Sequence, residues 1–251
     1  MRLIIGLIVC IFSLVSYCGS KEFNPVTGEK QYIALTTRQE IELGERALPE
    51  MLQEYGGLYP DQEVQNYIDK VGLKLIRNSS AKDTPWQFAF HLLNDPKTVN
   101  AFALPGGQIF VTSGLYKLLP AESQLAAVMA HEIAHVVARH SAEHIAKARL
   151  AQGLTDAVIV ASGDATAGQI SAVVGQLVTM KFSREDEVQA DRLGVNFMAD
   201  AGYDPKGMIQ LMEILQKTQS GNRLPEFFST HPNPENRIEK IQQAIEDHLS
   251  K

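Results

Sequence analysis

His131-Glu132-Ile133-Ala134-His135 lies inside residues 121–144, a run without Gly or Pro that we predict to be one helix. Residues four apart in a helix lie one above the other on the same face, so His131 and His135 can direct imidazole nitrogens at one metal ion, with Glu132 beside it. The flanking residues are apolar on nearly every side, which predicts a buried central helix. Two histidines in such a helix need partners, and a metal ion would satisfy both.

The spacing of these residues is the one found in zinc peptidases. Zinc lowers the pKa of its bound water to about 7, and a neighbouring carboxylate accepts the proton as the water attacks a carbonyl carbon. A five-residue pattern with two free positions also occurs by chance. The alternatives are therefore a solvated His-Glu pair, which the apolar flanks disfavour, and two satisfied core histidines, which leave the downstream segments unexplained.

Two further histidines follow the pattern, but neither shares its face. At about 100° per residue, His140 points to the opposite side of a continuous helix and His144 lies well off the face, so we predict structural roles for both. A second known arrangement needs a Gly at position 138 and a third His at position 141. It is excluded, because these positions hold Ala138 and Ser141. The remaining solution is a Glu from a separate helix. Residues 183–191 open one, and Glu187 is the predicted third ligand, with water in the fourth position.

Three segments together carry a family resemblance: HEIAH at 131–135, SREDEVQADRLG at 183–194 and STHPNPENRI at 229–238. They resemble the zinc metallopeptidase family of HtpX and the CAAX prenyl proteases, over roughly residues 35–245. The length and the N-terminal apolar run are similar to its short, periplasmic, lipoprotein-like branch. The resemblance implies a zinc-dependent endopeptidase of the cell envelope that acts on unfolded or misassembled proteins. An envelope assembly or chaperone-like binding factor with a latent or structural zinc site is the alternative.

The resemblance also implies roles for individual residues. His131, His135 and Glu187 would bind one Zn²⁺ per chain, with Glu132 as the general base. Asp191, one turn after Glu187, would be a carboxylate that supports the ligands. Many family members have Glu where this chain has Gln189. Because that side chain lies off the face of Glu187 and Asp191, we expect the metal site to be unaffected.

The third segment holds two further candidate catalytic residues, His231 and Arg237. Pro232 and Pro234 fix an extended loop between them, which can direct side chains toward a site. Either residue could stabilise the oxyanion of the transition state. The resemblance implies a second role for His231, in which it binds the open position of the zinc as a latch. In the alternative, His231 caps the last helix and Arg237 pairs with a surface carboxylate.

The remaining pattern predicts an α+β, mainly helical, zincin-like domain over residues 37–251, with a small sheet before the metal-binding helix. Strands are expected at 86–93, 101–103 and 108–112. An edge strand beside the metal pairs with the substrate backbone in zincins, so we assign substrate binding to Asn100, Ala101, Phe102 and Ala103. A plain core hairpin is the alternative. Residues 150–180 are expected to form a helical hairpin over the cleft.

The N-terminus predicts export. Residues 1–18 combine a basic start with a short apolar run, as in a signal peptide, and Cys18 resembles a lipidation site although Tyr17 before it is unusually large. Residues 19–36 are polar and predicted to be a tether. We therefore expect a periplasmic protein held at the membrane by a lipid anchor, and the alternative is an uncleaved N-terminal anchor or a cut at another position. Its partners would be protein or peptide substrates, and a net charge of −6 without a basic block argues against nucleic acid.

Overall fold

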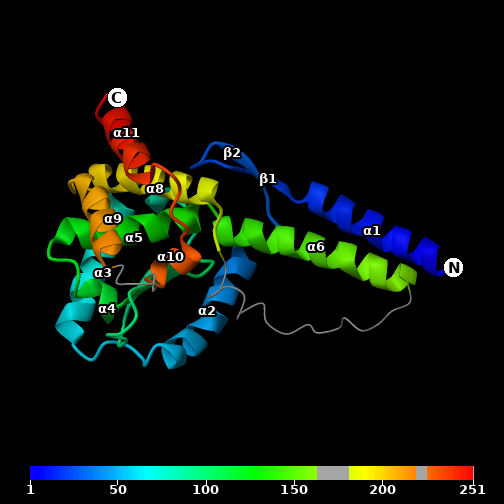
Figure 1. Ribbon diagram of the computed structural model, residues 1–251, viewed down its shortest axis with the longest axis horizontal. Coiled ribbons are helices and arrows are strands. Elements are labelled where there is room, and N and C mark those ends of the chain that lie inside the picture. Colours follow the sequence, from blue (N-terminus) through cyan, green and yellow to red (C-terminus); the bar gives the residue numbers. More distant parts are fainter. Residues whose placement is uncertain (163–180, 219–224, 251) are drawn as a thin grey trace.

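Helices dominate the computed structural model, which describes residues 1–162, 181–218 and 225–250 (Figure 1). The helices are α1 (Arg2–Gly19), α2 (Thr37–Glu54), α3 (Gln62–Arg77), α4 (Ser113–Tyr116), α5 (Glu122–Val137), α6 (His140–Ser162), α8 (Arg184–Asp200), α9 (Lys206–Lys217), α10 (Phe227–Thr230) and α11 (Arg237–Leu249). The strands are β1 (Lys21–Asn24), β2 (Glu29–Tyr32), β3 (Ala89–Leu93), β4 (Ala101–Ala103) and β5 (Gln108–Thr112), and a 3₁₀ turn spans Ser80–Asp83. The expected mainly helical α+β fold is confirmed.

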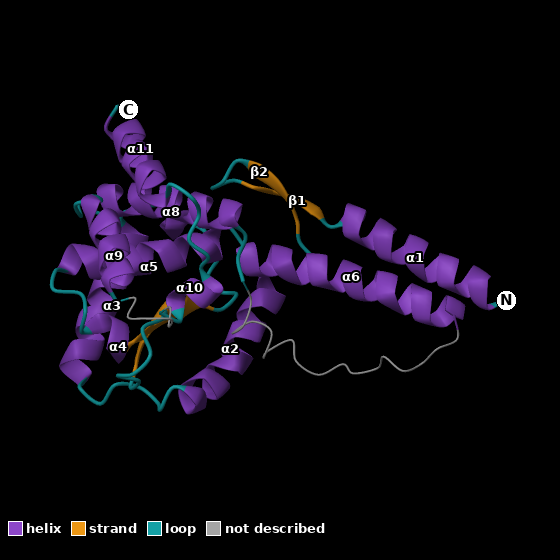
Figure 2. Ribbon diagram, in the orientation of Figure 1, coloured by secondary structure: helices purple, strands orange, loops and turns teal. Residues whose placement is uncertain are grey.

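A three-stranded sheet lies next to α5 (Figure 2). Its order is β3-β5-β4, with β3 parallel and β4 antiparallel to β5. The first strand begins at Ala89, three residues later than its alternating pattern predicted. β4 is at an edge of the sheet, as expected, and packs against α5.

Helix α5 is the centre of the core. Every residue from Gln124 to Val137 is buried, because α3, α8, α9 and the sheet pack around it. A helix covered on all sides must be apolar on all sides, which explains the sequence around the two histidines. The prediction of a buried central helix is therefore confirmed.

The predicted single helix over 121–144 is wrong, because the chain breaks between α5 and α6. Arg139 adopts a left-handed backbone conformation, with φ of 58°. This conformation costs about 1–3 kcal/mol. The contacts of the guanidinium offset that cost: it donates to the buried carboxylate of Glu40 at 2.6 Å and to the carbonyl of Leu35 at 2.9 Å. Residues after Arg139 therefore do not continue the α5 register.

Residues 21–32 form the hairpin β1–β2 where a polar tether was predicted. Asn24 and Gln31 face inward and donate their side-chain amides to the carbonyls of Val137 and Ala138, at 2.9 and 2.6 Å. These carbonyls at the end of α5 have no partner within a helix that stops there, so the hairpin satisfies them. The N-terminal segment is thus part of the support of the metal-binding helix.

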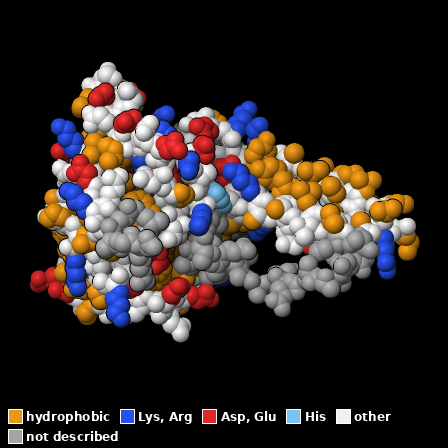
Figure 3. Space-filling model, in the orientation of Figure 1, with side chains coloured by type: hydrophobic (Ala, Val, Ile, Leu, Met, Phe, Trp, Pro, Cys, Tyr) orange, Lys and Arg blue, Asp and Glu red, His pale blue; other side chains and the backbone are white. Residues whose placement is uncertain are grey.

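Helices α1 and α6 pack along each other and project from the body as an arm (Figure 1). Gly6 permits this close packing, because a Cβ there would lie 2.7 Å from the carbonyl oxygen of Ala157. α1 is long and apolar enough to cross a membrane, and its apolar side chains are exposed along the arm (Figure 3). Of the hairpin expected over 150–180, α6 runs to Ser162 along the arm, and the rest lies outside the described residues.

Candidate metal centre

Two imidazole nitrogens meet on the buried face of α5. Nε2 of His131 lies 3.0 Å from Nε2 of His135, and both side chains are almost inaccessible to solvent. Two such nitrogens, one helical turn apart, form half of a tetrahedral coordination site. The structure thus brings the two histidines together as their spacing predicted.

Glu187 reaches this pair from α8. Its carboxylate oxygens lie 3.5 Å from Nε2 of His131 and 3.4 Å from Nε2 of His135. Gly194 lets α8 approach α5, because a Cβ there would lie 3.3 Å from the backbone nitrogen of His131. The structure thus brings Glu187 to the position in which a third ligand is needed.

His231, in the loop before α11, provides a fourth donor. Its Nδ1 lies 3.0 Å from Oε1 of Glu187 and 3.4 Å from Nε2 of His131. The ring is fully buried and stacks on Phe227, with the ring centroids 4.5 Å apart. Of the two occupants considered for this corner of the site, water and His231 as a latch, the structure places the imidazole of His231 there.

The four donors have the spacing of a tetrahedral metal site. Zinc bonds of about 2.0–2.1 Å separate the atoms of a tetrahedron by about 3.3 Å. The five pairs described above, in which Glu187 contributes one oxygen or the other, lie 3.0 to 3.5 Å apart, and one donor atom from each of the four residues lies within 4.8 Å of the others. Imidazole nitrogens with one carboxylate are a ligand set that suits Zn²⁺. These residues therefore fit a metal ion, and their chemistry is typical of zinc.

The carboxylate of Glu132 lies beside these donors without a hydrogen-bond partner. Both of its oxygens are buried and unpaired within the described residues, and the nearest basic atom is Nε2 of His231 at 3.6 Å. Burial raises the pKa of Glu132. A buried unpaired carboxylate destabilises a fold, so its presence next to metal donors is best explained by chemistry with a ligand. It can accept a proton from water at the metal.

The sequence of residues 62–245 matches the sequence model of peptidase family M48. The chain belongs to this family. The resemblance drawn from the three sequence segments is thereby confirmed, and with it the expectation of a metalloprotease.

Relatives of this M48 chain carry protease names. The mitochondrial metalloendopeptidase OMA1 of Schizosaccharomyces pombe is 34% identical over 236 residues, which are 92% of this chain and 68% of that protein. The beta-barrel assembly-enhancing protease of Escherichia coli is 31% identical over 234 residues, 89% of this chain and 47% of its own length. The OMA1 protein of Saccharomyces cerevisiae is 28% identical over 238 residues. The chain thus spans about half the length of the bacterial relative.

Protonation in the M48 site differs between its ligands. Burial holds the pKa of His135 well below its usual value, which favours the neutral imidazole that binds metal. Burial would raise the pKa of Glu187, but His231, His131 and His135 together hold it well below its usual range. Burial lowers the pKa of His131, yet Asp191 and Glu187 outweigh it and raise that pKa to about 9. Metal binding must therefore displace a proton from His131.

Asp191 and Arg237 lie behind the ligands of the M48 site. Oδ1 of Asp191 lies 2.9 Å from Nδ1 of His131, the position predicted for a carboxylate that orients a ligand. Arg237 donates to both oxygens of Asp191 at 2.7 and 2.9 Å, and its Nη1 lies 3.1 Å from Oε2 of Glu187. The guanidinium is buried against these two carboxylates. This geometry favours a supporting role for Arg237 over oxyanion binding, and it is not the surface pair of the alternative.

Two residues near the ligands were misjudged or missed from sequence. Nδ1 of His140 lies 2.8 Å from Nδ1 of His135, because the break at Arg139 places the first residue of α6 beside the site. Phe182 stacks on His135 with the ring centroids 4.0 Å apart. No residue near position 139 signals the break, so the contact of His140 could not be predicted. Phe182 is an apolar residue directly before the predicted start of the Glu187 helix, and that position is a signal that it packs near the ligands.

The segment assigned to substrate lies on β4 at the edge of the sheet. Its backbone is approached at one end by the loop that leads to His231: the amide of Phe227 donates to the carbonyl of Val99 at 3.1 Å. The side chain of Asn100 donates to Glu226 at 3.3 Å. Ala101 and Phe102 are buried, and Ala103 is partly exposed. The loop that carries His231 is thus attached to the start of this strand.

Proposed function

We propose that this chain is a zinc-dependent endopeptidase of the cell envelope that cleaves unfolded or misassembled proteins. The observation that carries the proposal is the buried, unpaired carboxylate of Glu132 beside four metal donors. Membership of a peptidase family supports proteolysis. A relative named for the assembly of beta-barrels supports a role in protein quality control.

Each residue then has a distinct task. With zinc bound, the site gains a Lewis acid that lowers the pKa of bound water to about 7. Glu132 would act as the general base, taking a proton from the attacking water and passing it to the leaving amine. Asp191 holds His131 in the orientation for metal binding, and Arg237 neutralises the carboxylates behind the site. The backbone of residues 100–103 pairs with the substrate, which places the scissile bond beside Glu132.

Removal of the metal tests this proposal. The purified protein is expected to bind about one zinc per chain and to cleave an unfolded protein such as casein. Because Glu132 alone cannot generate the nucleophile, a chelator should abolish cleavage, and added Zn²⁺ should restore it. Metal analysis and gel-based cleavage assays measure both. Cleavage that continues after the metal has been removed would contradict the proposal.

A structural zinc site is the second candidate, and one observation favours it. Nδ1 of His231 completes a set of four protein donors, and structural zinc sites have four protein ligands whereas catalytic ones keep an open position. The chain would then be an assembly or chaperone-like binding factor. Against this stands Glu132, because a purely structural site has no use for a buried, unpaired carboxylate. We therefore propose that His231 is a displaceable latch.

Replacement of the latch distinguishes the two candidates. We expect His231→Ala, at matched zinc occupancy, to cleave a short unstructured peptide several-fold faster than the wild type, since the closed resting state no longer competes with substrate. His248→Ala, on α11 and away from the site, is the control and should leave the rate unchanged. A His231→Ala protein that binds zinc and cleaves nothing, like the wild type, would support the structural site.

Attachment to the membrane is proposed through Cys18. The residue is exposed, next to β1, and preceded by the apolar run of α1. Lipidation at Cys18 would remove residues 1–17 and tether the domain through the short segment before the hairpin. Cys18→Ser is then expected to abolish the incorporation of a labelled fatty acid and to leave the apolar helix α1 attached to the chain. Mass spectrometry of the wild-type N-terminus measures the same event, and an unmodified Cys18 preceded by Tyr17 would refute it.

A further inference from the structure

A chain of hydrogen bonds leads away from His135 on the side opposite the metal donors. Nδ1 of His135 lies 2.8 Å from Nδ1 of His140, and Nε2 of His140 lies 2.9 Å from Oε1 of Gln189. The amide of Gln189 in turn donates to Oε2 of Glu29 at 2.9 Å. These residues come from α5, α6, α8 and β2, so the chain connects four separate elements of the fold.

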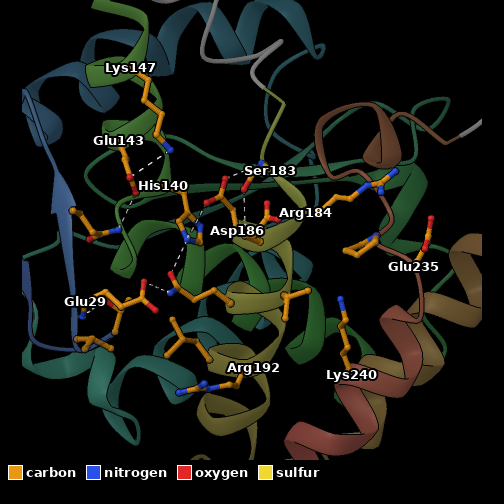
Figure 4. Close-up of a pocket in the computed structure, with 18 residues that line it drawn as sticks. Glu29, His140, Glu143, Lys147, Ser183, Arg184, Asp186, Arg192, Glu235 and Lys240 are labelled. Atoms are coloured by element: carbon orange, nitrogen blue, oxygen red, sulfur yellow. Dashed lines mark hydrogen bonds and ion pairs between the residues drawn. The ribbon is translucent and has the colours of Figure 1, made fainter. Parts of the chain in front are cut away.

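The outer end of this chain lies in a cleft of about 820 Å³ between the β1–β2 hairpin, α6 and α8 (Figure 4). Glu29, His140 and Gln189 are among the residues that line it, and Figure 4 shows Glu29 and His140 approaching from different elements. His140 itself is buried. Asp186 lies in the same cleft, but its nearest oxygen is 3.8 Å from Nε2 of His140, and it is already paired with His144 at 2.8 Å. Gln189 is therefore the hydrogen-bond partner of His140.

The chemistry of the outer end fixes the direction of every bond. A carboxylate accepts hydrogen bonds and does not donate, so Gln189 must turn its NH₂ group toward Glu29 and its carbonyl oxygen toward His140. That oxygen can only accept, which requires the proton of His140 to be on Nε2. Nδ1 of His140 is then an acceptor, and His135 must donate from its Nδ1.

The chemistry of the metal end requires the same direction. Nε2 of His135 faces Glu187 and His131, and it binds a metal ion only when it carries no proton. The single proton of the neutral ring is then on Nδ1, where it needs an acceptor because the ring is buried. A proton on Nδ1 of His140 would set two donors against each other at 2.8 Å. Both ends of this series of hydrogen bonds thus require the same tautomers, with the proton of His135 on Nδ1 and the proton of His140 on Nε2.

We propose that His140 and Gln189 are positioning residues that hold His135 in its metal-binding tautomer, with Glu29 of the N-terminal hairpin setting the direction of the chain. The two ligating histidines are then supported differently, His131 by a carboxylate and His135 by a neutral imidazole. This inference rests on the metal site of the proposed function and extends it to residues outside the HEIAH segment.

Zinc affinity of the purified full-length protein tests the role of His140 without reference to proteolysis. His140→Phe keeps an aromatic ring but removes the acceptor, so the zinc dissociation constant should rise by about 10- to 100-fold. His140→Asn offers a carbonyl oxygen near the position of Nδ1, and its dissociation constant should stay close to that of the wild type. His144→Phe, one turn later on α6 and paired with Asp186 instead, is the matched control and should bind zinc like the wild type.

Competition with a chromophoric chelator gives the dissociation constants, and the visible spectrum of the Co²⁺-loaded protein reports the ligand geometry. A shifted cobalt spectrum in His140→Phe, but not in His140→Asn, supports the proposal. Equal losses of affinity in both variants would indicate packing and overturn it, as would wild-type affinity in His140→Phe. Absence of proteolysis in the wild type would refute the proposed function and leave these affinities interpretable.

Gln189→Leu provides a second measurement that does not depend on the folding of the His140 variants. Gln189 is only partly buried, and the change removes the acceptor of the Nε2 proton of His140. His140 is then free to carry its proton on Nδ1, facing His135. We expect a several-fold weaker zinc affinity. Affinity equal to that of the wild type would contradict the role of Gln189.

Discussion

The Glu132→Gln variant is expected to keep its zinc and its fold and to lose proteolytic activity by about 10²- to 10⁴-fold. An amide has the shape of the carboxylate, but it cannot take a proton from water at the metal. The carboxylate oxygens of Glu132 have no hydrogen-bond partner among the described residues, so the substitution breaks no hydrogen bond and changes only the 3.6 Å approach of Nε2 of His231. The loss should therefore appear in kcat, with little change in KM.

The same variant should be as stable as the wild type or more stable. Glu132 is fully buried, and burial raises its pKa, so the ionised carboxylate opposes folding. A neutral amide removes that penalty. Thermal unfolding of the zinc-loaded proteins measures this effect. Higher stability combined with lost activity is the pattern of a residue retained for function.

Glu122→Gln is the matched control for this prediction. It makes the same chemical change at the start of the same helix, where one oxygen of Glu122 accepts a hydrogen bond from Tyr67 and the other accepts one from Tyr203. In the amide the oxygen still accepts from one hydroxyl, and the NH₂ group can donate to the oxygen of the other. Its activity should equal that of the wild type. If Glu132→Gln cleaved an unfolded protein at the rate of this control, Glu132 would not be the general base.

The convergence of His131, His135 and Glu187 could be predicted because local geometry determines it. On a helix, the spacing of His131 and His135 places both rings on one face. Glu187 follows an N-cap serine that marks the start of α8. Apolar residues on all sides of α5 indicated its burial. The strands at 101–103 and 108–112 followed from alternation on either side of a Pro-Gly-Gly turn. In each case the decisive residues lie within a few positions of one another.

The rest of the site depends on contacts between distant segments. The break at Arg139 is stabilised by Glu40, 99 positions earlier, and the end of α5 is satisfied by Asn24 and Gln31 of the hairpin. Polar residues between positions 19 and 36 indicated a tether because the sequence does not show where their hydrogen bonds go. The hydrogen bond between Gln189 and His140 could not be predicted for a related reason, because a continuous helix would turn His140 away from the site.

Arg237→Ala is expected to destabilise the fold by about 3–5 kcal/mol and to weaken zinc binding. The guanidinium is only 3% exposed and makes two hydrogen bonds to Asp191 and an ion pair with Glu187. Burial would raise the pKa of Asp191, but Arg237 and His131 hold it below its usual value. Without the guanidinium, two carboxylates remain buried with their charge uncompensated, beside a histidine whose orientation Asp191 controls.

Denaturant unfolding of metal-free and zinc-loaded protein measures the loss of stability, and chelator competition measures the loss of affinity. Arg192→Ala, next to Asp191 on α8 but exposed, is the control and should stay within about 0.5 kcal/mol of the wild type. Arg237→Lys keeps the charge but cannot donate to both oxygens of Asp191. Its stability and zinc affinity should therefore lie between those of Arg237→Ala and those of the wild type.

These measurements also distinguish the two roles considered for Arg237. A donor to the oxyanion acts only in the transition state, so its removal would lower kcat while the stability and the zinc affinity stay those of the wild type. A guanidinium that neutralises Asp191 and Glu187 acts in the resting protein, so its removal lowers stability and affinity first. At full zinc occupancy much of the rate should then return, because the atoms that contact substrate remain. If Arg237→Ala had the unfolding free energy of the wild type and a large loss of kcat, Arg237 would instead be the donor to the oxyanion.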